Sequence, residues 1–342
     1  NWYWAVYDST LEQTAIFGDF SFDFTDNFTV TAGGRWYKVE EDRHTIIGGL
    51  MQGGFPNVFT DLVFSDETRQ SQESGFLPKA SLEYRVTDDK LIYLTFSEGF
   101  RSGGGNAARR DSIFANEFAT YKSDILVNYE WGAKTAWFDG RLQLNAAAYW
   151  MIWKDIQIQL EDPDPVLFQL GFVNFPEAKV RGFEIDFQLV PAESWNLGGS
   201  VSYNDAVISK TETLGDFTAV EGTRLPITPD WKASAWVEYS FPTEVFGALP
   251  YVRFDYSHTG ESINSLGGFE AIVGGYDPTT QDPYDIGDFK IGLDADLWSA
   301  SLYIDNVWDE RGDQFISNRW AVQRLSINTP RTFGLSFRKR FK

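Results

Sequence analysis

Apolar and polar residues alternate along two neighbouring segments on either side of a short turn. The first segment puts one row of apolar residues on a single face, namely Ile125, Val127, Tyr129, Trp131 and Ala133. After Asp139-Gly140 the second segment continues with Leu142, Leu144, Ala146, Ala148, Trp150 and Ile152. A side-chain period of two predicts extended strands, and Asp-Gly is a favoured two-residue hairpin turn. The pattern therefore predicts a β-hairpin.

The predicted hairpin is long enough to cross a bilayer. Each strand runs for about 15 residues, whereas a typical strand has about five or six. A tilted strand needs only about 9–11 residues to span a membrane. Its apolar face would contact lipid, and its polar face would contact water inside a closed barrel. The hairpin thus indicates an outer-membrane type of barrel.

Short and long connectors alternate along the rest of the chain. The short ones are Thr25–Asn27, Thr87–Lys90, Asp139-Gly140, Pro191–Ser194, Pro242–Ala248 and Asp294–Ser299. The long polar ones cover about residues 42–68, 101–119, 160–168, 209–225, 260–283 and 309–324. This sorting predicts an all-β fold, a transmembrane antiparallel up-and-down β-barrel with about 14 strands in this chain, periplasmic short turns and extracellular long loops. A soluble β-sandwich or solenoid is the alternative, but its turns would not sort into two length classes.

Composition supports the membrane interpretation. No run of 18 or more apolar residues is present, so no membrane-spanning helix is expected. Aromatic residues make up 17% of the chain, and barrels place rings at both membrane interfaces. The chain has no cysteine, which excludes disulfides and thiolate metal sites within it. The net charge of −20 argues against a nucleic-acid partner, because such a partner needs a basic surface.

No residue pattern indicates catalysis. The only histidines, His44 and His258, lie far apart in the sequence, and no nucleophile elbow, phosphate loop or zinc-protease motif occurs. Asp162-Pro163-Asp164-Pro165 could offer carboxylates to Ca²⁺, but a hairpin loop explains the segment equally well and is favoured. We therefore expect no enzyme activity, no resident metal and no cofactor.

Two groups of residues are candidates for binding functions. The loop candidates, whose rings and charge suit ligand contacts, are Arg101, Phe114, Phe118, Phe269, Tyr276 and Trp320. Packing of loop against loop over the barrel mouth is the alternative for each ring. The charges expected to face the lumen are Arg35, Arg85, Glu130, Lys134, Glu184 and Asp186. In an open pore these charges would line the water path and set ion selectivity.

The final strand, Thr332–Phe341, places Phe333, Leu335, Phe337 and Phe341 on one face. An amphipathic last strand that closes on an aromatic residue is similar to the signal for barrel insertion, which assigns that role to Phe337 and Phe341. One residue, Lys342, follows the aromatic. An ordinary edge strand that ends in Phe is the alternative.

Six segments together resemble TonB-dependent receptors, the outer-membrane importers of iron chelates, cobalamin and glycans. They are Phe96–Gly104, Tyr129–Lys134, Trp137–Leu142, Lys179–Glu184, Pro226–Trp231 and Asp305–Arg311. The resemblance spans nearly all of residues 1–342 and implies a single domain, the C-terminal portion of a barrel of about 22 strands. The plug domain and TonB box of the family have no counterpart in this sequence.

The resemblance implies active import of a scarce small-molecule ligand across the bacterial outer membrane. Its energy would come from the TonB complex through a plug domain absent from this chain, and the lumen-facing charges would contact that plug. Outer-membrane lipid and lipopolysaccharide are the expected surroundings. A passive plugless porin and a structural or adhesive surface barrel are the alternative functions.

Overall fold

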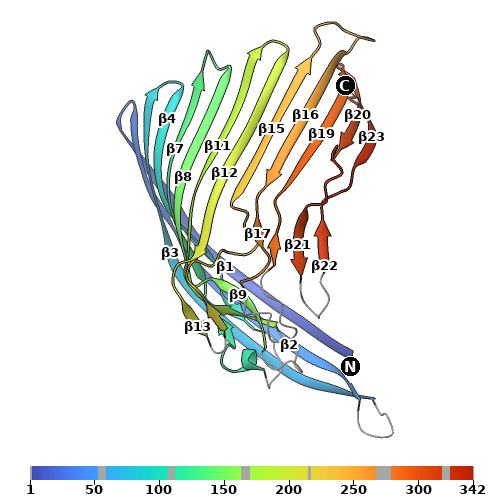
Figure 1. Ribbon diagram of the computed structural model, residues 1–342. Helices are drawn as coiled ribbons and strands as arrows, with labels where there is room; N and C mark the ends of the chain where they lie inside the picture. Colours follow the sequence, from blue (N-terminus) through green and yellow to red (C-terminus); the bar gives the residue numbers. More distant parts are fainter. Residues whose placement is uncertain are drawn as a thin grey trace.

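The computed structural model describes residues 2–52, 59–106, 112–162, 170–214, 217–266, 279–317 and 324–341. Within them, 13 antiparallel strands form one curved sheet (Figure 1). In sheet order these are β1 (Trp2–Thr25), β2 (Phe28–Gln52), β3 (Phe59–Thr87), β4 (Lys90–Arg101), β7 (Asp124–Trp137), β8 (Leu142–Lys154), β11 (Ala178–Ala192), β12 (Trp195–Ile208), β15 (Trp231–Ser240), β16 (Leu249–Thr259), β19 (Tyr284–Asp294), β20 (Trp298–Asp305) and β23 (Thr332–Lys339).

The connectors at one end of this sheet carry short strand pairs of their own. These pairs are β5 (Gly104–Gly105) with β6 (Thr120–Tyr121), β9 (Gln157–Glu161) with β10 (Leu170–Asn174), β13 (Glu212–Leu214) with β14 (Phe217–Ala219), β17 (Ser262–Ile263) with β18 (Thr280–Gln281), and β21 (Asp313–Ser317) with β22 (Arg324–Ile327). One 3₁₀ turn, η1 (Ile113–Ala115), lies between β5 and β6. No helix of the described residues is both long and apolar enough to cross a bilayer.

Each main strand pairs with the next main strand along the chain, which confirms the up-and-down arrangement. Thirteen strands take part, one fewer than the approximate count expected from the sequence. The expected long connector over residues 42–68 is wrong, because most of these residues extend β2 and β3 and pair with each other. Figure 1 shows the resulting long arm of β1, β2 and β3 beyond the other strands. Most of its outward side chains in β2 and β3, such as Glu40, Asp42 and Gln72, are polar, which is why a pattern typical of a membrane strand is lost there.

The strand register assigns every side chain to one of two faces. Trp131 lies opposite Ala148, and Ala148 lies opposite Phe183, so these apolar side chains share a face across β7, β8 and β11. We call it the outer face. Glu130 and Tyr149, one position away, share the opposite, inner face. Trp131 is 60% exposed, an exposure that suits a lipid neighbour and not water.

Aromatic side chains mark the two borders of the apolar outer face. In β7, β12 and β15 the two border positions lie eight residues apart, as Trp137 and Tyr129, Trp195 and Tyr203, and Tyr239 and Trp231. Eight strand residues tilted in a barrel span a height of about 20 Å, close to the about 25 Å apolar band of such barrels. We call the row near the short turns the turn-side girdle and the other row the loop-side girdle.

Contacts between rings join each girdle across strands. Trp195 and Tyr239 have ring centroids 4.8 Å apart on the turn side, and Tyr203 and Trp231 have the same separation on the loop side. Trp308, which follows β20, packs edge-on against Phe254 at 6.2 Å and so extends the loop-side girdle beyond the strands. The outer face is therefore an apolar band bounded by two rows of rings.

Tyrosine rings on the inner face lie over glycines of the neighbouring strand. Tyr93 lies opposite Gly132, where a Cβ would approach the ring Cζ to 2.5 Å, and Tyr251 lies over Gly292 in the same way. Such a distance is far below van der Waals contact, so only glycine leaves room for the ring. The same pairing recurs at Tyr37–Gly75, Tyr149–Gly182 and Tyr303–Gly334.

Candidate ligand-binding loops and lumen face

The connector between β4 and β7 folds back over the inner face of the long arm. Arg43 of β2 donates from Nη1 to the carbonyl of Gly105 at 2.8 Å, and the Gly105 amide donates to Glu41 Oε2 at 3.3 Å. Arg69 of β3 donates to the carbonyls of Ala115 and Ala119, each at 3.0 Å. Side chains of the arm thus hold the connector in place along its length, and Glu41 becomes buried beneath it.

Arg101, a loop candidate, ends β4 and pairs with Asp124 at the start of β7. Its Nε donates to Asp124 Oδ2 at 2.8 Å, and its guanidinium lies 5.0 Å from the ring centre of Trp153. Asp124 is 1% exposed, whereas Arg101 is 53% exposed. Asp124 also accepts a hydrogen bond from the Gln157 amide at 3.3 Å. The pair therefore ties the two ends of the first connector to the second connector at the mouth of the sheet, while it leaves part of the guanidinium on the surface.

Three connectors share a hydrophobic core of their own. It contains Phe114 from the first connector, Leu160, Val173 and Phe175 from the second, Ala219 and Leu225 from the third, and Ile208 from the end of β12, among other residues. We call residues 102–123, 155–177 and 209–230, as far as the structure describes them, the loop cluster. Because each connector is too short to bury an apolar face alone, the three are stabilised only together.

The rings at the centre of this cluster pack against protein. Phe114 is 0% exposed, and Phe118 packs against the same core with its ring centroid 6.5 Å from that of Phe114. In this arrangement Phe114 takes the loop-packing role that the sequence left as the alternative to ligand contact. Three further candidates, Phe269, Tyr276 and Trp320, lie outside the described residues.

Asp162 stabilises the loop cluster through hydrogen bonds. Its Oδ2 accepts from the Ser112 hydroxyl at 2.6 Å and from the Ile113 amide at 3.0 Å, at the start of η1. These donors occupy the carboxylate that the sequence offered as a possible calcium ligand, and residues 163–165 of that segment lie outside the described residues. Among described residues, no group of three or more His, Asp or Glu is placed to hold a metal ion.

The six charges expected in the lumen share the inner face. Arg35 lies opposite Leu77, which is on the same face of β3 as Arg85. Glu130 and Lys134 lie opposite inner-face residues of β8, and the same row of β8 lies opposite Glu184 and Asp186. Two of them have neighbours on the same face, because Glu130 accepts from the Tyr93 hydroxyl at 2.7 Å and Asp186 accepts from Asn145 at 2.9 Å.

Some buried polar atoms on the inner face have no partner among the described residues. They are Arg35 Nε and the amide oxygens of Asn128, Asn196 and Asn204, and all four side chains project from that face by register. A buried polar atom is stable only beside a hydrogen-bonding neighbour. The inner face is thus suited to contact water or polar protein.

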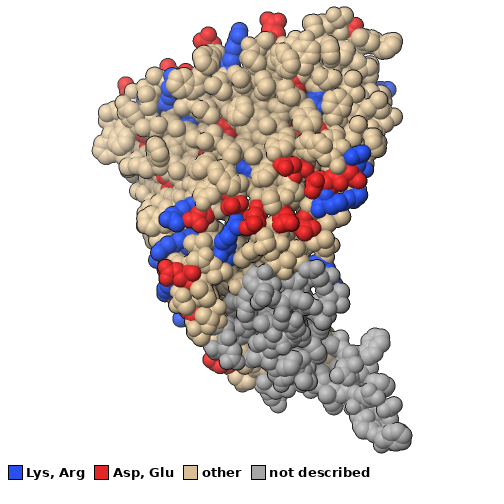
Figure 2. Space-filling model, in the orientation of Figure 1, with Lys and Arg blue, Asp and Glu red and all other residues tan. Residues whose placement is uncertain are grey.

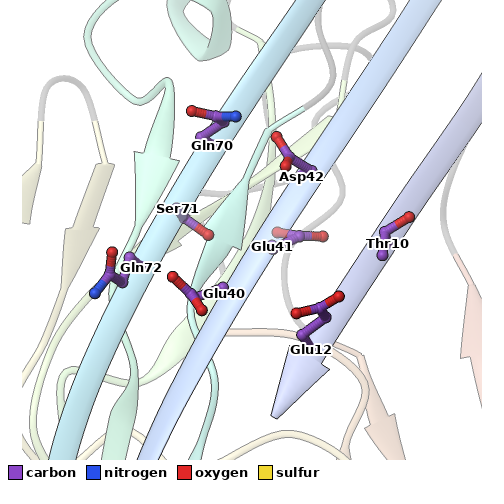
Figure 3. Close-up of a pocket in the computed structure, with 8 residues that line it drawn as sticks. All are labelled: Thr10, Glu12, Glu40, Glu41, Asp42, Gln70, Ser71 and Gln72. Carbon is purple, nitrogen blue, oxygen red and sulfur yellow. The ribbon is translucent and has the colours of Figure 1, made fainter.

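The outer face of the long arm carries a polar groove that the sequence did not predict. The groove has a volume of about 370 Å³, and Glu12, Glu40 and Asp42 line it from β1 and β2 (Figure 3). Glu12 and Glu40 lie directly opposite each other. Like charges in that position are destabilising, but Lys38 pairs with Glu40 at 2.8 Å. Sequence reasoning missed this groove because residue 42 onward was expected to form a loop.

Charge separates along the molecule. In Figure 2 charged residues lie at the turn end, few interrupt the zone below it, and both signs gather again in a zone nearer the loop end. Ion pairs near the loop ends of the strands include Arg181–Asp205 at 2.7 Å and Arg224–Glu261 at 3.1 Å. The two histidines form hydrogen bonds with carboxylates, because a ring nitrogen of His44 lies 2.8 Å from Asp66 Oδ1 and one of His258 lies 2.8 Å from Asp285 Oδ1.

Asn306 positions the last long connector, a role that sequence reasoning did not assign. It adopts a left-handed φ of 54° and its Nδ2 donates to the carbonyls of Glu310 and Thr329 at 2.9 and 3.0 Å. Nearby, the Arg331 amide donates to Asp309 at 2.9 Å. This hydrogen bond, with the Arg311 charge, lowers the pKa of the Asp309 carboxyl. The segment Asp305–Arg311 stood out in the sequence only for its resemblance to a family, which did not indicate the structural role of Asn306.

Comparisons with known proteins agree with this architecture. The family model described as "TonB dependent receptor-like, beta-barrel" matches residues 3–307. The Pesticin receptor of Yersinia pestis is 25% identical over 333 residues, which cover 96% of this chain and 44% of that protein. The chain therefore spans less than half the length of the curated relatives it matches.

Solved structures show the same fold. The ferric yersiniabactin uptake receptor FyuA from Yersinia pestis superposes with a TM-score of 0.77 at 18% identity, over 100% of this chain and 47% of that one. The siderophore receptor PiuA from Acinetobacter baumannii gives a TM-score of 0.72 at 17% identity, over 97% of this chain and 43% of its own.

Proposed function

The chain belongs to the TonB-dependent receptor family of Gram-negative outer-membrane barrels, and we propose that it supplies the barrel wall and capture loops of an importer for a metal chelate. The relatives are receptors and not enzymes, and several are named for siderophore or metal–chelate ligands. Of the ligand classes that the resemblance implied, an iron or other metal chelate is therefore preferred over cobalamin or a glycan.

The observation that carries this proposal is the loop cluster held over the inner face of the sheet. A ligand that enters from the loop end would meet a mouth whose walls are positioned by buried contacts such as Arg101–Asp124. Preorganised walls lower the entropic cost of binding. Arg101, partly exposed there, could contact an anionic chelate, and Phe118, which packs beside Phe114 and is only partly buried, is a second candidate. Phe269, Tyr276 and Trp320 remain candidates on their sequence positions alone.

The inner face supports a polar partner in the lumen. In an importer this partner would be the plug, and TonB would act on that plug to release the ligand inward. Arg35, Arg85, Glu130, Lys134, Glu184 and Asp186 would form part of the contact surface. The buried unpartnered atoms on the same face, such as Arg35 Nε, agree with that role.

Cations beyond the loop-side girdle suit an anionic outer leaflet. Lys154, Lys179 and Arg181 project from the outer face of β8 and β11, with Trp150 and Phe183 of the girdle beside them. Phosphate groups attract such side chains where lipid meets water. We propose that lipopolysaccharide phosphates contact these three residues.

Uptake by the whole receptor in the outer membrane tests the import proposal. Cells that lack other siderophore receptors would be supplied with ⁵⁵Fe-loaded chelates of several chemical types, with and without TonB. We expect uptake of at least one chelate that disappears without TonB. Uptake that persists without TonB, together with single-channel conductance, would instead support the porin. Absence of both, with retained attachment of cells to surfaces, would support the adhesive barrel.

A further inference from the structure

Two of the short turns place a phenylalanine in a backbone conformation that large side chains rarely adopt. Phe138 has φ of 57° and Phe246 has φ of 58°. In the connector of β15 and β16, Val245 and Ala248 pair through hydrogen bonds of 2.8 and 3.1 Å around Phe246-Gly247. Such a turn favours Asn or Asp before Gly. Phenylalanine there is strained, and strain of this kind clusters at functional sites.

Both strained rings project away from the protein. Phe138 is 71% exposed and Phe246 is 87% exposed. Apolar neighbours in the second turn, Phe241, Val245 and Leu249, are also exposed. The tips of the β1–β2 and β3–β4 turns are instead polar, with Asp26-Asn27 and Asp88-Asp89. These four turns therefore fall into an aromatic kind and an acidic kind.

The aromatic turns continue the turn-side girdle. Phe241 contacts Tyr239 edge-on at 4.9 Å, and Tyr239 in turn contacts Trp195. In the other hairpin Phe138 directly follows Trp137, and Lys90 lies 4.1 Å from the ring centre of Trp137. A lysine beside a ring is the arrangement expected where a membrane meets water, because the apolar stem and ring stay in lipid while the ammonium reaches phosphate.

We propose that the turns bearing Phe138 and Phe246 dip into the headgroup region of the phospholipid leaflet at the turn side and anchor the barrel at that depth. Transfer of each ring out of water offsets the unfavourable backbone conformation that aims it there. The acidic turns stay in water. This inference rests on the position of the barrel in the membrane and is independent of the imported ligand.

A depth measurement tests the anchor directly. Because the chain has no cysteine, Phe138→Cys or Phe246→Cys supplies a single thiol in it for a spin label, with any cysteine elsewhere in the receptor replaced by serine. Asp26→Cys and Asp88→Cys are the matched controls at acidic tips. The labelled receptor is reconstituted in vesicles of phosphatidylethanolamine and phosphatidylglycerol, with a polar nickel chelate on both sides.

The two kinds of turn should then differ in which relaxant reaches the label. At positions 138 and 246 we expect collisions with oxygen to exceed those with the nickel chelate several-fold, and at 26 and 88 the reverse. Nickel accessibility at 138 and 246 equal to that of the controls would overturn the proposal, and it would point to rings that serve an aqueous protein partner.

A substitution that relieves the strain gives a second readout. Asparagine fits the left-handed position better than phenylalanine. If the Phe246 ring gained nothing from lipid, Phe246→Asn would therefore make the protein more resistant to urea. The anchor instead predicts a lower urea midpoint for Phe246→Asn in phospholipid vesicles. A reporter thiol introduced by Glu244→Cys should also react faster with a maleimide in the aqueous phase when Phe246→Asn is present. A midpoint that rises in vesicles contradicts the anchor.

Discussion

The half of the sheet next to the short turns and the half next to the long loops are stabilised by different means. In the turn half, large apolar side chains such as Trp131 and Leu335 point outward and remain exposed on the protein surface. In the loop half, Phe114, Leu160 and Ala219 are buried within the loop cluster. Lipid supplies the apolar surroundings in the first case, whereas the protein must supply them itself in the second.

The two halves also differ in their polar contacts, which are mainly between backbone groups in the turn half and between side chains and backbone in the loop half. Backbone ladders account for most of the order in the turn half, because strand follows strand with short turns. The loop half depends on buried side chains that accept or donate to backbone, such as Asp124, Asp162 and Asn306. A single substitution should therefore act locally in the loops but through the lipid contact in the strands.

The largest effect concerns which half reaches the cell exterior. Asp139→Cys in a short turn should stay unlabelled on intact cells treated with an impermeant maleimide, and Glu221→Cys in the loop cluster should be labelled fully. The membrane excludes the reagent from the periplasm, so the contrast is all or none. The opposite result would invert the topology and exchange the two halves.

Removal of a core ring should open the loop half alone. Phe114→Ala creates a cavity in the loop cluster, and we expect a loss of about 3–5 kcal/mol of local stability. Amide exchange should speed up over residues 112–123 and 155–162, while strands β7 and β8 stay protected. Leu335→Ala, an outward residue of the turn half, is the control and should leave that exchange unchanged. If both halves exchange together in Phe114→Ala, they form one cooperative unit.

A charge on the lipid side tests the turn half. Ala146 lies midway between the girdles on the outer face, so Ala146→Arg should cost about 2–4 kcal/mol. Asn145 projects from the inner face beside Asp186, and Asn145→Arg should be far milder. Reversible unfolding in vesicles measures both. Equal penalties would contradict the register.

The smallest effect is a dependence on pH in the last connector. The Arg331 amide lowers the pKa of Asp309 in the folded protein. The contact is therefore fully present above the ordinary pKa of an aspartate and is lost as the pH falls through the lowered value. Exchange at residues 324–331, taken relative to the intrinsic amide rate at each pH because that rate itself falls in acid, should rise in acid, and Asp309→Asn should abolish that rise. A rise that persists in the variant would assign it to another group.

The sequence predicts the turn half well and the loop half poorly. Period-two patterns define β7 and β8 because lipid on one side and water on the other sort their side chains. The same rule fails at residues 42–68, since most outward side chains of the arm are polar and the apolar signal disappears while the strands continue. The turn at Asp139-Gly140 is visible in the sequence, but the left-handed Phe138 and Phe246 are not.

The candidate site residues in the strands could also be placed from the sequence, whereas those in the loops could not. The inner face of the six lumen candidates is fixed by register, so alternation was enough to place them together. Phe114 and Arg101 were grouped by chemistry alone, and only the fold shows that one is packed away and the other is paired to Asp124. Contacts between connectors far apart in the sequence have no periodic signature, which is why the roles of Asp124 and Asn306 were not predicted and Asp162 was considered only as a possible calcium ligand.

The tyrosine–glycine pairs on the inner face disfavour wrong strand registers as the barrel assembles. A slip of one residue reverses the faces and is penalised by lipid, but a slip of two keeps every apolar side chain outward. It would also bring Tyr93 over Glu130 or Lys134 in place of Gly132. The same pairing recurs at Tyr149–Gly182, Tyr251–Gly292 and Tyr303–Gly334. A two-residue slip would therefore make tyrosine rings clash with side chains at several strand pairs. These glycines therefore disfavour a two-residue shift of the strands, which contact with lipid alone does not penalise.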